Sequence, residues 1–506
     1  MTTLIPAPAP ANGTGTGSGT GTAADRRRWA GLAVLAASLL VVVMDMTILN
    51  VALPDLTADL RPSAVQQLWV VDAYALVLAG LLVPIAALGD RWGRKRMLLA
   101  GFAVFGVASL LVLVADSPGD VIAVRALLGV GGAMIMPTTL SLIRTLFADP
   151  RERATALGVW GAMAAVGGAV GPIVGGALLE SFSWHAAFLF NVPVMVVAIV
   201  AGWLLLPESR SDRPGRLDAA GVVLSFGGMA ALVYGVKELG KHGATVTALA
   251  TLVAGVLLLT AFVRRCLAQT DPMLEVRLFT QRAFTAGVLA ALTTSMAMVA
   301  LLLLGSQWLQ LVHGWSPLQT GAALLPMAVG GIIGSPLAPG VAARVGARPV
   351  LAGGLAVAGV GLLLLFVLPQ PLSYVSVAAS LTLVGIGTAS LAVGSAVIMG
   401  SAPADQAGSA AAIEESSYEI GAVLGVAILG SLAAWVYRDG LPSGATGLAR
   451  ESLAGALGTP VGSTAVDAFE HSFAVFGLAA GLLLLAASAL VWRLTPADLD
   501  LADAHH

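Results

Sequence analysis

VVVMDMTILNVALP, residues 41–54, places one carboxylate, Asp45, inside an apolar run that extends from Trp29 to Leu53. A helix of about 20 apolar residues is long enough to cross the hydrocarbon core of a bilayer. A carboxylate in hydrocarbon costs on the order of 3 kcal/mol or more, so Asp45 is expected to face a protein interior or a water-filled cavity. It is then either a protonatable site or anchor for a cationic ligand, or a tolerated packing acid.

The composition of the whole chain agrees with this single segment. The 506 residues are 58% hydrophobic and only 11% charged, and the mean hydropathy is +0.91. Such values are typical of a polytopic membrane protein and not of a soluble protein of this length.

Several functional classes find no support in the sequence. The net charge of -2 gives no reason to expect nucleic-acid binding. Cys266 is the only cysteine, so an intrachain disulfide is excluded. The six histidines are scattered, and HExxH, CxxC and Walker A motifs are all absent. We therefore expect no metal, no cofactor, no ATP-hydrolysing motor and no enzymatic activity.

The apolar segments predict an all-α membrane protein with 14 transmembrane helices. The expected ranges are 30–53, 67–88, 97–115, 120–143, 154–179, 185–206, 217–238, 245–264, 283–305, 318–342, 349–368, 373–399, 407–436 and 472–493.

The distribution of basic residues predicts the orientation of these helices. Segments on the side of the termini hold 20 Lys and Arg, whereas the opposite loops hold 5, among them Lys237. Cytoplasmic loops carry the excess of basic residues, so both termini are expected in the cytoplasm. The first 25 residues are rich in Thr, Gly, Ala and Pro and predict a disordered tail.

The loop after the second predicted helix reads GDRWGRKR, residues 89–96. A tight glycine-containing turn with alternating charge can lock two helix ends together and release them when the halves of a transporter rock. The residues expected to act in this way are Asp90, Arg91, Gly93 and Arg94. The alternative is a basic loop that only sets the topology.

Two further helices carry unusual residues. Arg125 lies within the fourth predicted span and is followed by small residues that let helices approach closely. An arginine inside a membrane span is expected to have a function. The fifth span reads GGAVGPIVGG, residues 167–176. Gly167, Gly171 and Gly175 form one smooth face, and Pro172 kinks the helix next to it. Ordinary tight packing is the alternative explanation.

The thirteenth span holds three acids and a tyrosine in the segment EESSYE, residues 414–419. Glu415 and Glu419 share one face of the helix, while Glu414 lies about 100° away. Three acids in an apolar segment are not expected to ionise together. Alternatively, these acids lie in the inner headgroup region and solvate the end of the helix.

Trp69 and Asp72 share a face of the second span. An aromatic ring beside a carboxylate suits a lipophilic cation. The equally simple interpretation is an interfacial tryptophan and a solvated acid.

Taken with these motifs, the chain resembles the major facilitator superfamily. The loop at 89–96 follows the pattern Gly-x-Leu-Ala-Asp-Arg-x-Gly-Arg-Lys, except that Ala86 stands at its first position. The strings MDMTIL (44–49), NVP (191–193) and SQWLQ (306–310) make it similar to the fourteen-span drug:proton antiporters, especially the quaternary ammonium compound (QacA-type) efflux pumps.

The resemblance implies roles for specific residues. It makes Asp45, Asp72, Glu414, Glu415 and Glu419 the membrane acids for proton coupling or substrate binding, with Arg125, Trp69 and Tyr418 beside them. It links Arg125 to coupling, although Leu128 replaces the family's Gln. The element with Gly167, Gly171, Pro172, Gly175 and Gly176 marks antiporters. Gly331 stands where some relatives have an acid.

The resemblance also implies a domain organisation. The expected parts are a tail (1–28), a six-helix bundle (29–206), an inserted helix pair (207–265), a linker (266–282), a second bundle (283–493, with a long outer loop at 437–471) and a second tail (494–506). Given its composition, the outer loop is either a short helix or hairpin, or a flexible connector.

The expected function is proton-coupled efflux of lipophilic, often cationic drugs by a monomer in the bacterial plasma membrane. The expected partners are these small molecules, protons and the lipid bilayer. Two rival functions stay open: a dedicated exporter of one natural product, and a non-transporting membrane scaffold or sensor.

Overall fold

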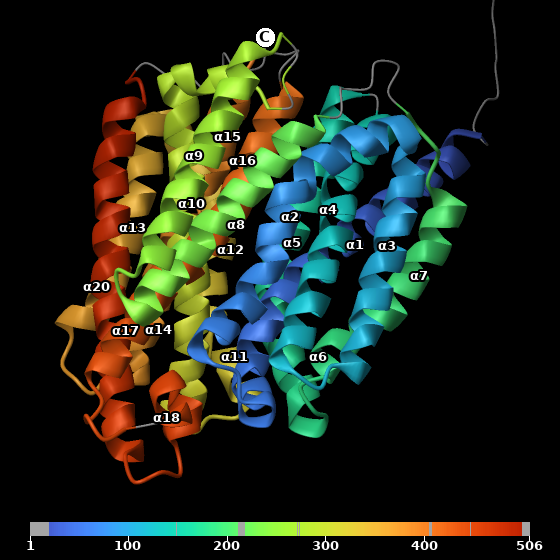
Figure 1. The fold of residues 1–506 in the computed structure, drawn as a ribbon. Coiled ribbons are helices and arrows are strands. Elements are labelled where there is room, and N and C mark those ends of the chain that lie inside the picture. Colours follow the sequence, from blue (N-terminus) through green and yellow to red (C-terminus); the bar gives the residue numbers. More distant parts are fainter. Residues whose placement is uncertain are drawn as a thin grey trace, which may run out of the picture.

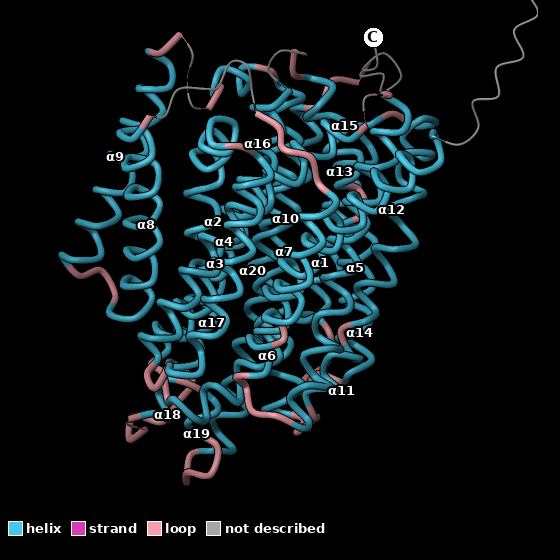
Figure 2. Tube along the Cα trace, turned by 90° about the vertical axis from the view of Figure 1, so that its right-hand side faces the viewer, coloured by secondary structure: helices cyan, strands magenta, loops and turns pink. Residues whose placement is uncertain are grey.

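A computed structural model describes residues 20–147, 149–210, 218–270, 272, 274–403, 407–445 and 447–497. Within these ranges the chain is helical and contains no β-strand. Most helices run along one common direction, side by side, and the short connections gather at the two ends of the molecule (Figure 1 and Figure 2).

The helices of the first half, and the pair that follows, have these bounds: α1 Thr20–Leu60, α2 Ala64–Trp92, α3 Arg94–Leu111, α4 Pro118–Leu146, α5 Pro150–Ser181, α6 Ala186–Leu189, α7 Asn191–Leu205, α8 Ala219–His242 and α9 Val246–Ala268. A short 3-10 helix, η1 Val112–Val114, extends α3.

The second half begins with a 3-10 turn and contains two π-helical segments. Its elements are η2 Val276–Thr280, α10 Arg282–Gln307, η3 Trp308–Val312, α11 Pro317–Ala323, α12 Leu325–Val345, α13 Ala347–Val367, α14 Tyr374–Thr388, α15 Leu391–Ser401, α16 Ala407–Leu424, η5 Gly425–Gly430, α17 Ser431–Asp439, α18 Leu448–Glu451, α19 Leu453–Ala456 and α20 Gly462–Leu494.

Helix starts follow from local sequence. Ser63 caps α2, and the Gln66 side chain bonds back to the Ser63 amide, so two otherwise unpaired amides are satisfied reciprocally. Ser117 and Asp120 form the same arrangement at the start of α4, where Pro118 occupies the first turn. Such caps place the helix starts close to where the apolar pattern predicts them.

Thirteen of the described helices are long and apolar enough to cross a membrane. The fourteenth expected span, 154–179, corresponds to α5, whose apolar part by this measure covers only Val166–Ser181. Two expected spans are each divided: 318–342 into α11 and α12 at Leu324, and 373–399 into α14 and α15. Pro326, which lacks an amide hydrogen, follows the first of these breaks.

Two expectations about the tail and the outer loop are corrected. The disordered tail was expected to include residues 20–28, but α1 begins at Thr20, and Arg28 pairs with Asp25 and with Glu152 of α5. Residues 1–19 lie outside the described part. The connection expected at 437–471 is shorter than predicted, because α17 ends at Asp439 and α20 begins at Gly462. α18 and α19 occupy part of it, as the short-helix alternative predicts.

Two large groups of buried apolar side chains hold the fold together. One is built mainly from α1 to α7, and the other from α10 to α20. α8 and α9 pack chiefly on each other, and α8 also contacts α2 and α17. Figure 2 shows this pair standing at the edge of the molecule.

We name the two ends of the molecule after residues in their turns. The Arg61 end holds the α1–α2 turn, and the Gly93 end holds the α2–α3 turn. Toward the Arg61 end, the second half donates hydrogen bonds to α1: Ser306 Oγ to the Asn50 carbonyl at 2.9 Å and Gln310 Nε2 to the Val51 carbonyl at 3.0 Å. Ser316 Oγ also donates to Glu180 of α5 at 2.8 Å. The two halves are therefore joined at this end.

Candidate functional site

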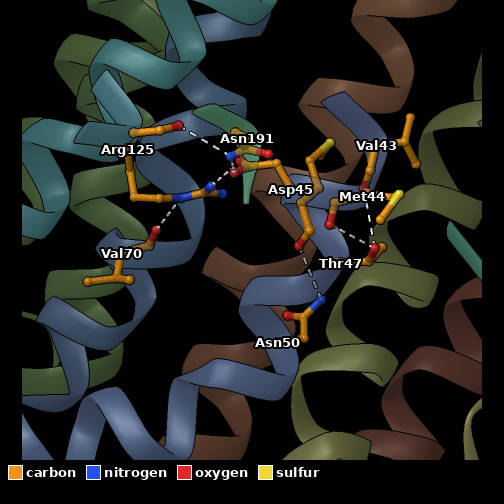
Figure 3. Close-up of polar contacts among 10 residues, drawn as sticks. Val43, Met44, Asp45, Thr47, Asn50, Val70, Arg125 and Asn191 are labelled. Carbon is orange, nitrogen blue, oxygen red and sulfur yellow. Dashed lines mark hydrogen bonds and ion pairs between the residues drawn. The ribbon is translucent and has the colours of Figure 1, made fainter. Parts of the chain in front are cut away.

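Asp45 is buried between three helices and is held by two side chains (Figure 3). Its Oδ2 accepts a hydrogen bond from Arg125 Nη1 of α4 at 2.7 Å, and both side chains are only 2% exposed. Its Oδ1 accepts from Asn191 Nδ2, at the start of α7, at 2.7 Å. The carboxylate predicted to face an interior does so, and its charge is compensated by the arginine predicted to be active.

Three contacts hold the Arg125 side chain in place, the first of them with Asp45. Its Nε donates to the Val70 carbonyl of α2 at 3.1 Å (Figure 3). Its guanidinium carbon lies 4.6 Å from the centre of the Tyr74 ring, a cation–π contact. The three partners come from α1 and α2, so one guanidinium ties α4 to both. Removing one partner of such a buried pair is strongly destabilising.

Asp72 and Trp69, expected on one face of α2, lie together as predicted, but a lysine occupies the space between them. Lys237 Nζ of α8 is 2.8 Å from Asp72 Oδ2 and 4.0 Å from the centre of the Trp69 ring. The count of Lys237 among the basic residues of the outer loops is wrong. Lys237 falls inside the expected span 217–238, and in the structure it lies within α8 and is buried.

The three acids of α16 lie in the second half. Glu419 is 5% exposed, and Glu414 and Glu415 are partly buried. Glu419 Oε2 is buried and has no hydrogen-bond partner in the part of the chain that the structure describes. Within the described part of the chain, none of the three acids forms an ion pair. Tyr418 is attached to α10 through its backbone, because Ser295 Oγ donates to its carbonyl at 2.6 Å.

The acids of α16 and the arginine pair meet across the boundary between the halves. α16 packs along α2. Tyr74 of α2 contacts Arg125 and is close enough to Asp45, Glu415 and Glu419 to interact with their charges. Its hydroxyl is buried and has no hydrogen-bond partner among the described residues. Tyr74 is therefore near both the compensated charge of the first half and the uncompensated charges of the second.

The α2–α3 turn is packed against the end of α7. Gly93 has φ +120°, and a Cβ there would lie 2.7 Å from Glu208 Oε1, so only glycine fits. The Arg94 amide donates to the Ser209 carbonyl at 2.9 Å, and the Lys95 amide donates to Glu208 at 3.1 Å. Arg91 lies on α2 and is exposed, and the side chain of Asp90 lies outside the described part.

The glycine face of α5 lies against two helices. A Cβ on Gly171 would overlap Thr47 of α1, while Gly167 and Gly175 also face α1. A Cβ on Gly176 would lie 2.5 Å from the Pro317 carbonyl at the start of α11. The small residues around Pro172 therefore permit close contact within the first half and between the halves.

Three residues of the site were given no role by the sequence. Asn191 was noted only within a family string, and Tyr74 and Lys237 were not singled out as site residues. A polar or basic residue inside a predicted span, as at 191 and 237, is the signal that could have found two of them. Among the described residues, no group of three His, Cys, Asp or Glu side chains could hold a metal ion.

With the geometry in place, comparison with known proteins identifies the family. Residues 35–426 match the Major Facilitator Superfamily. The chain belongs to this superfamily. It is accordingly a membrane transporter, a multi-pass protein of the bacterial plasma membrane, and not an enzyme.

Curated relatives cover nearly the whole chain. The multidrug efflux pump LfrA of Mycolicibacterium smegmatis is 40% identical over 92% of this chain and 96% of its own length. The methyl viologen resistance protein SmvA of Salmonella typhimurium is 37% identical over 92% and 98%. Among solved structures, a bacterial homologue of the human lysosomal transporter Spinster aligns with a TM-score of 0.64 at 17% identity, over 92% of this chain and 97% of its own, and thus shares the fold.

Proposed function

We propose that this transporter is a proton-coupled antiporter that exports lipophilic, often cationic compounds from the cytoplasm. The proposal includes fourteen spans with α5 as the fourteenth, cytoplasmic termini, two six-helix bundles with α8 and α9 inserted between them, and a monomeric state. The names of the two relatives, an efflux pump and a methyl viologen resistance protein, support export of drugs and cations.

The observation that carries the proposal is the buried pair of Asp45 and Arg125. The carboxylate has two strong donors, one 2.7 Å from each oxygen, and is almost fully buried. A proton added to this carboxylate removes the charge that holds the guanidinium, so protonation loosens the junction of α1, α2 and α4. In reverse, re-forming the pair expels the proton. A pair of this kind converts proton binding into helix movement.

The acids of α16 supply the other half of the exchange. Glu415 and Glu419 have no cationic partner among the described residues, so a positively charged drug can provide one. Lipophilic cations suit this position because the surrounding helices are apolar and aromatic rings contact cations favourably. Protons and drugs then compete for carboxylates, and each drug leaving is exchanged for protons entering.

Alternating access requires that one end closes as the other opens. The hydrogen bonds from Ser306 and Gln310 to α1 support closure at the Arg61 end, which we assign to the outside. The turn at Gly93, together with Asp90, Arg91 and Arg94, is assigned to control of the inner end. The glycine face of α5 provides a surface along which the helices can slide.

Transport in inverted membrane vesicles tests the function. A gradient that is acid inside should drive accumulation of ethidium, and a protonophore should abolish it. Vesicles with Asp45→Asn serve as the matched control, because this variant keeps the shape of the side chain and loses its titration. Accumulation that requires ATP and ignores the protonophore would rule out proton coupling.

The range of substrates separates the proposal from its rivals. A host that lacks its own pumps should be protected against several unrelated toxic cations. Protection against one chemical scaffold alone identifies a dedicated exporter. No protection, together with no proton release on drug addition, identifies a scaffold or sensor.

A further inference from the structure

The ion pair between Asp72 and Lys237 is the most deeply buried charged contact outside the Asp45 site in the described part of the chain. The Lys237 side chain is 0% exposed and that of Asp72 is 1% exposed. Apart from their contact at 2.8 Å, neither Nζ nor Oδ2 has a hydrogen-bond partner among the described residues. Each charge is therefore compensated by the other, and removing one would leave the other buried and unpaired, which destabilises the fold.

The pair joins elements that are far apart in the chain. Asp72 lies in α2 of the first half, and Lys237 lies in α8 of the inserted pair. α8 also packs on α17 and η5 of the second half, so it stands at the boundary between the halves. A small crevice there is lined by Ala64, Val65, Leu68, Lys237, Ser431, Ala434 and Arg438.

The local chemistry is that of an occupied cation site. A carboxylate and the face of a tryptophan ring are the two groups that recognise organic cations. The Lys237 ammonium contacts both, at 2.8 Å from Asp72 and 4.0 Å from the Trp69 ring centre. The position that a bound cation or proton would take on Asp72 is filled by a cation that is covalently part of the protein.

Other charged groups around α2 already have their own partners or lie on other helices. Arg125 of α4 is held by Asp45. Asp59 of α1 accepts a hydrogen bond from Trp184. Glu419 of α16 interacts with Tyr74, and Arg438 of α17 lines the crevice. η5 has no titratable residue. Lys237 is thus the counter-charge of Asp72.

A second ion pair of the inserted helices supports this distinction. Near the Gly93 end, Arg265 of α9 donates to Asp218, which precedes α8, at 2.8 Å. This hydrogen bond holds the pKa of Asp218 at about 2, so Asp218 stays ionised near neutral pH. That ion pair closes the α8–α9 hairpin on itself, whereas the Lys237 pair attaches the hairpin to α2.

We propose that Lys237 is a permanent internal counter-cation that withdraws Asp72 from the exchange of protons and drugs. The proposal rests on the function proposed above and specifies which acids perform it. Asp45, Glu415 and Glu419 take part in the exchange, while Asp72 remains paired with Lys237 throughout the cycle. Lys237 is thus a positioning residue: by keeping Asp72 paired, it limits the number of carboxylates that can exchange a proton for a drug.

The decisive variant removes both charges together. Asp72→Leu/Lys237→Met replaces a buried ion pair with apolar side chains, a change that is often neutral or stabilising for folding. Proton release is measured on adding ethidium to the detergent-purified protein near neutral pH. We expect the same number of protons per bound ethidium as in the wild type. A loss of one proton per molecule would show that Asp72 exchanges in the wild type and would overturn the proposal.

A single substitution gives the opposite, positive signal. Lys237→Met leaves the Asp72 carboxylate uncompensated in an apolar environment, where it is expected to take up a proton. Ethidium should then release up to one more proton per molecule than in the wild type. Lys237→Arg keeps the positive charge and should restore the wild-type number. An extra proton that persists in Lys237→Arg would contradict the proposed role of the charge.

Two controls separate this inference from the proposed function and from a purely structural role. If the wild type releases no protons, proton-coupled export fails, and the assignment of acids within it falls with it. If the wild type releases protons, the double variant decides. Glu238→Gln removes a neighbouring charge on α8 without touching Asp72 and should leave the proton number unchanged. A structural role alone predicts lower melting temperatures for Lys237→Met but no change in proton number, which would also contradict the proposal.

Discussion

The two halves of the membrane interior treat buried charge in opposite ways. In the first half, Asp45 is paired with Arg125, and Asp72 is paired with Lys237, in contacts of 2.7 and 2.8 Å. In the second half, Glu415 and Glu419 have no cationic partner among the described residues, and one oxygen of Glu419 is buried without any hydrogen bond. Tyr74 interacts with charges of both halves.

This difference indicates a division of labour. A paired charge is stable where it stands, so the first half holds its helices in fixed positions until a proton disturbs a pair. An unpaired acid is stabilised only by a proton or by a cation from outside. In the antiporter proposed above, the second half would therefore receive the drug, and the first half would convert protonation into movement.

The largest expected effect comes from breaking the pair in the first half. Arg125→Met leaves the Asp45 carboxylate buried without its cation and should lower the free energy of unfolding by about 3–5 kcal/mol. Export should be lost. Denaturation midpoints in detergent, compared with the wild type, measure the effect on stability. Arg125→Lys is the matched control: it keeps the charge but cannot bridge Asp45 and the Val70 carbonyl in the same geometry. A midpoint unchanged in Arg125→Met would mean that the pair does not hold the helices.

The next effect concerns function more than stability. Asp45→Asn keeps the size of the side chain and removes its charge and titration. Arg125 keeps its contacts with Val70 and Tyr74, and the amide oxygen of the new Asn can still accept a hydrogen bond from it, so the loss of stability should be smaller than in Arg125→Met. We expect normal expression and membrane insertion, loss of most of the cation-driven proton release, and a larger loss for dications than for monocations. Release like that of the wild type would place the coupling acid on α16 instead.

A smaller effect on folding is expected when an acid of the second half is neutralised. Glu419→Gln removes a charge that has no ionic partner, so the free energy of unfolding should change by less than about 1 kcal/mol. Affinity for a dicationic probe such as methyl viologen should nevertheless fall by about tenfold, or ~1.4 kcal/mol. Binding titrations and denaturation on the same preparation test both statements. If Glu419→Gln instead caused a large loss of stability and left binding unchanged, Glu419 would act in folding and not in drug binding, and the contrast between the halves would be wrong.

The smallest effect is expected at Glu414, which lies on a different side of α16 and interacts with Ser395 of α15. Glu414→Gln should change the free energy of unfolding by about 0.5 kcal/mol or less and leave proton release unchanged. If Glu414→Gln reduces proton release as strongly as Glu419→Gln, the acids of α16 act together, and the distinction between their two faces is wrong.

Most of the fold was predictable because membrane helices are defined by a strong and local signal. Apolar runs gave the spans to within a few residues in most places. The errors have local causes: α20 starts ten residues before the expected 472, because the small and polar residues from Gly462 onward weaken the apolar signal without interrupting the helix. Similarly, Leu324 divides a span that hydropathy reads as continuous.

The sequence shows which polar residues fall inside membrane spans, but not which of them pair with each other. Asp45 and Arg125 were each expected to have a functional role, because an ionised side chain inside a membrane span is energetically costly and rarely occurs without one. Asp45 and Arg125 are 80 residues apart in the sequence, and no local sequence pattern shows that their side chains are in contact. The same holds for Asp72, whose partner lies in a helix pair that sequence analysis treated as an insertion. Pairing is a property of packing, and packing is not encoded in any one segment.

The attachment of α8 to α2 has a consequence for shortening this chain. An engineer who removed α8 and α9 to obtain a smaller transporter would delete Lys237 along with them. The truncated protein would then carry an orphaned acid, Asp72, on a surface newly turned toward lipid. A truncated protein would therefore also need Asp72 replaced by an apolar residue. The α8–α9 hairpin and the Asp72 carboxylate depend on each other, so they have to be kept together or removed together.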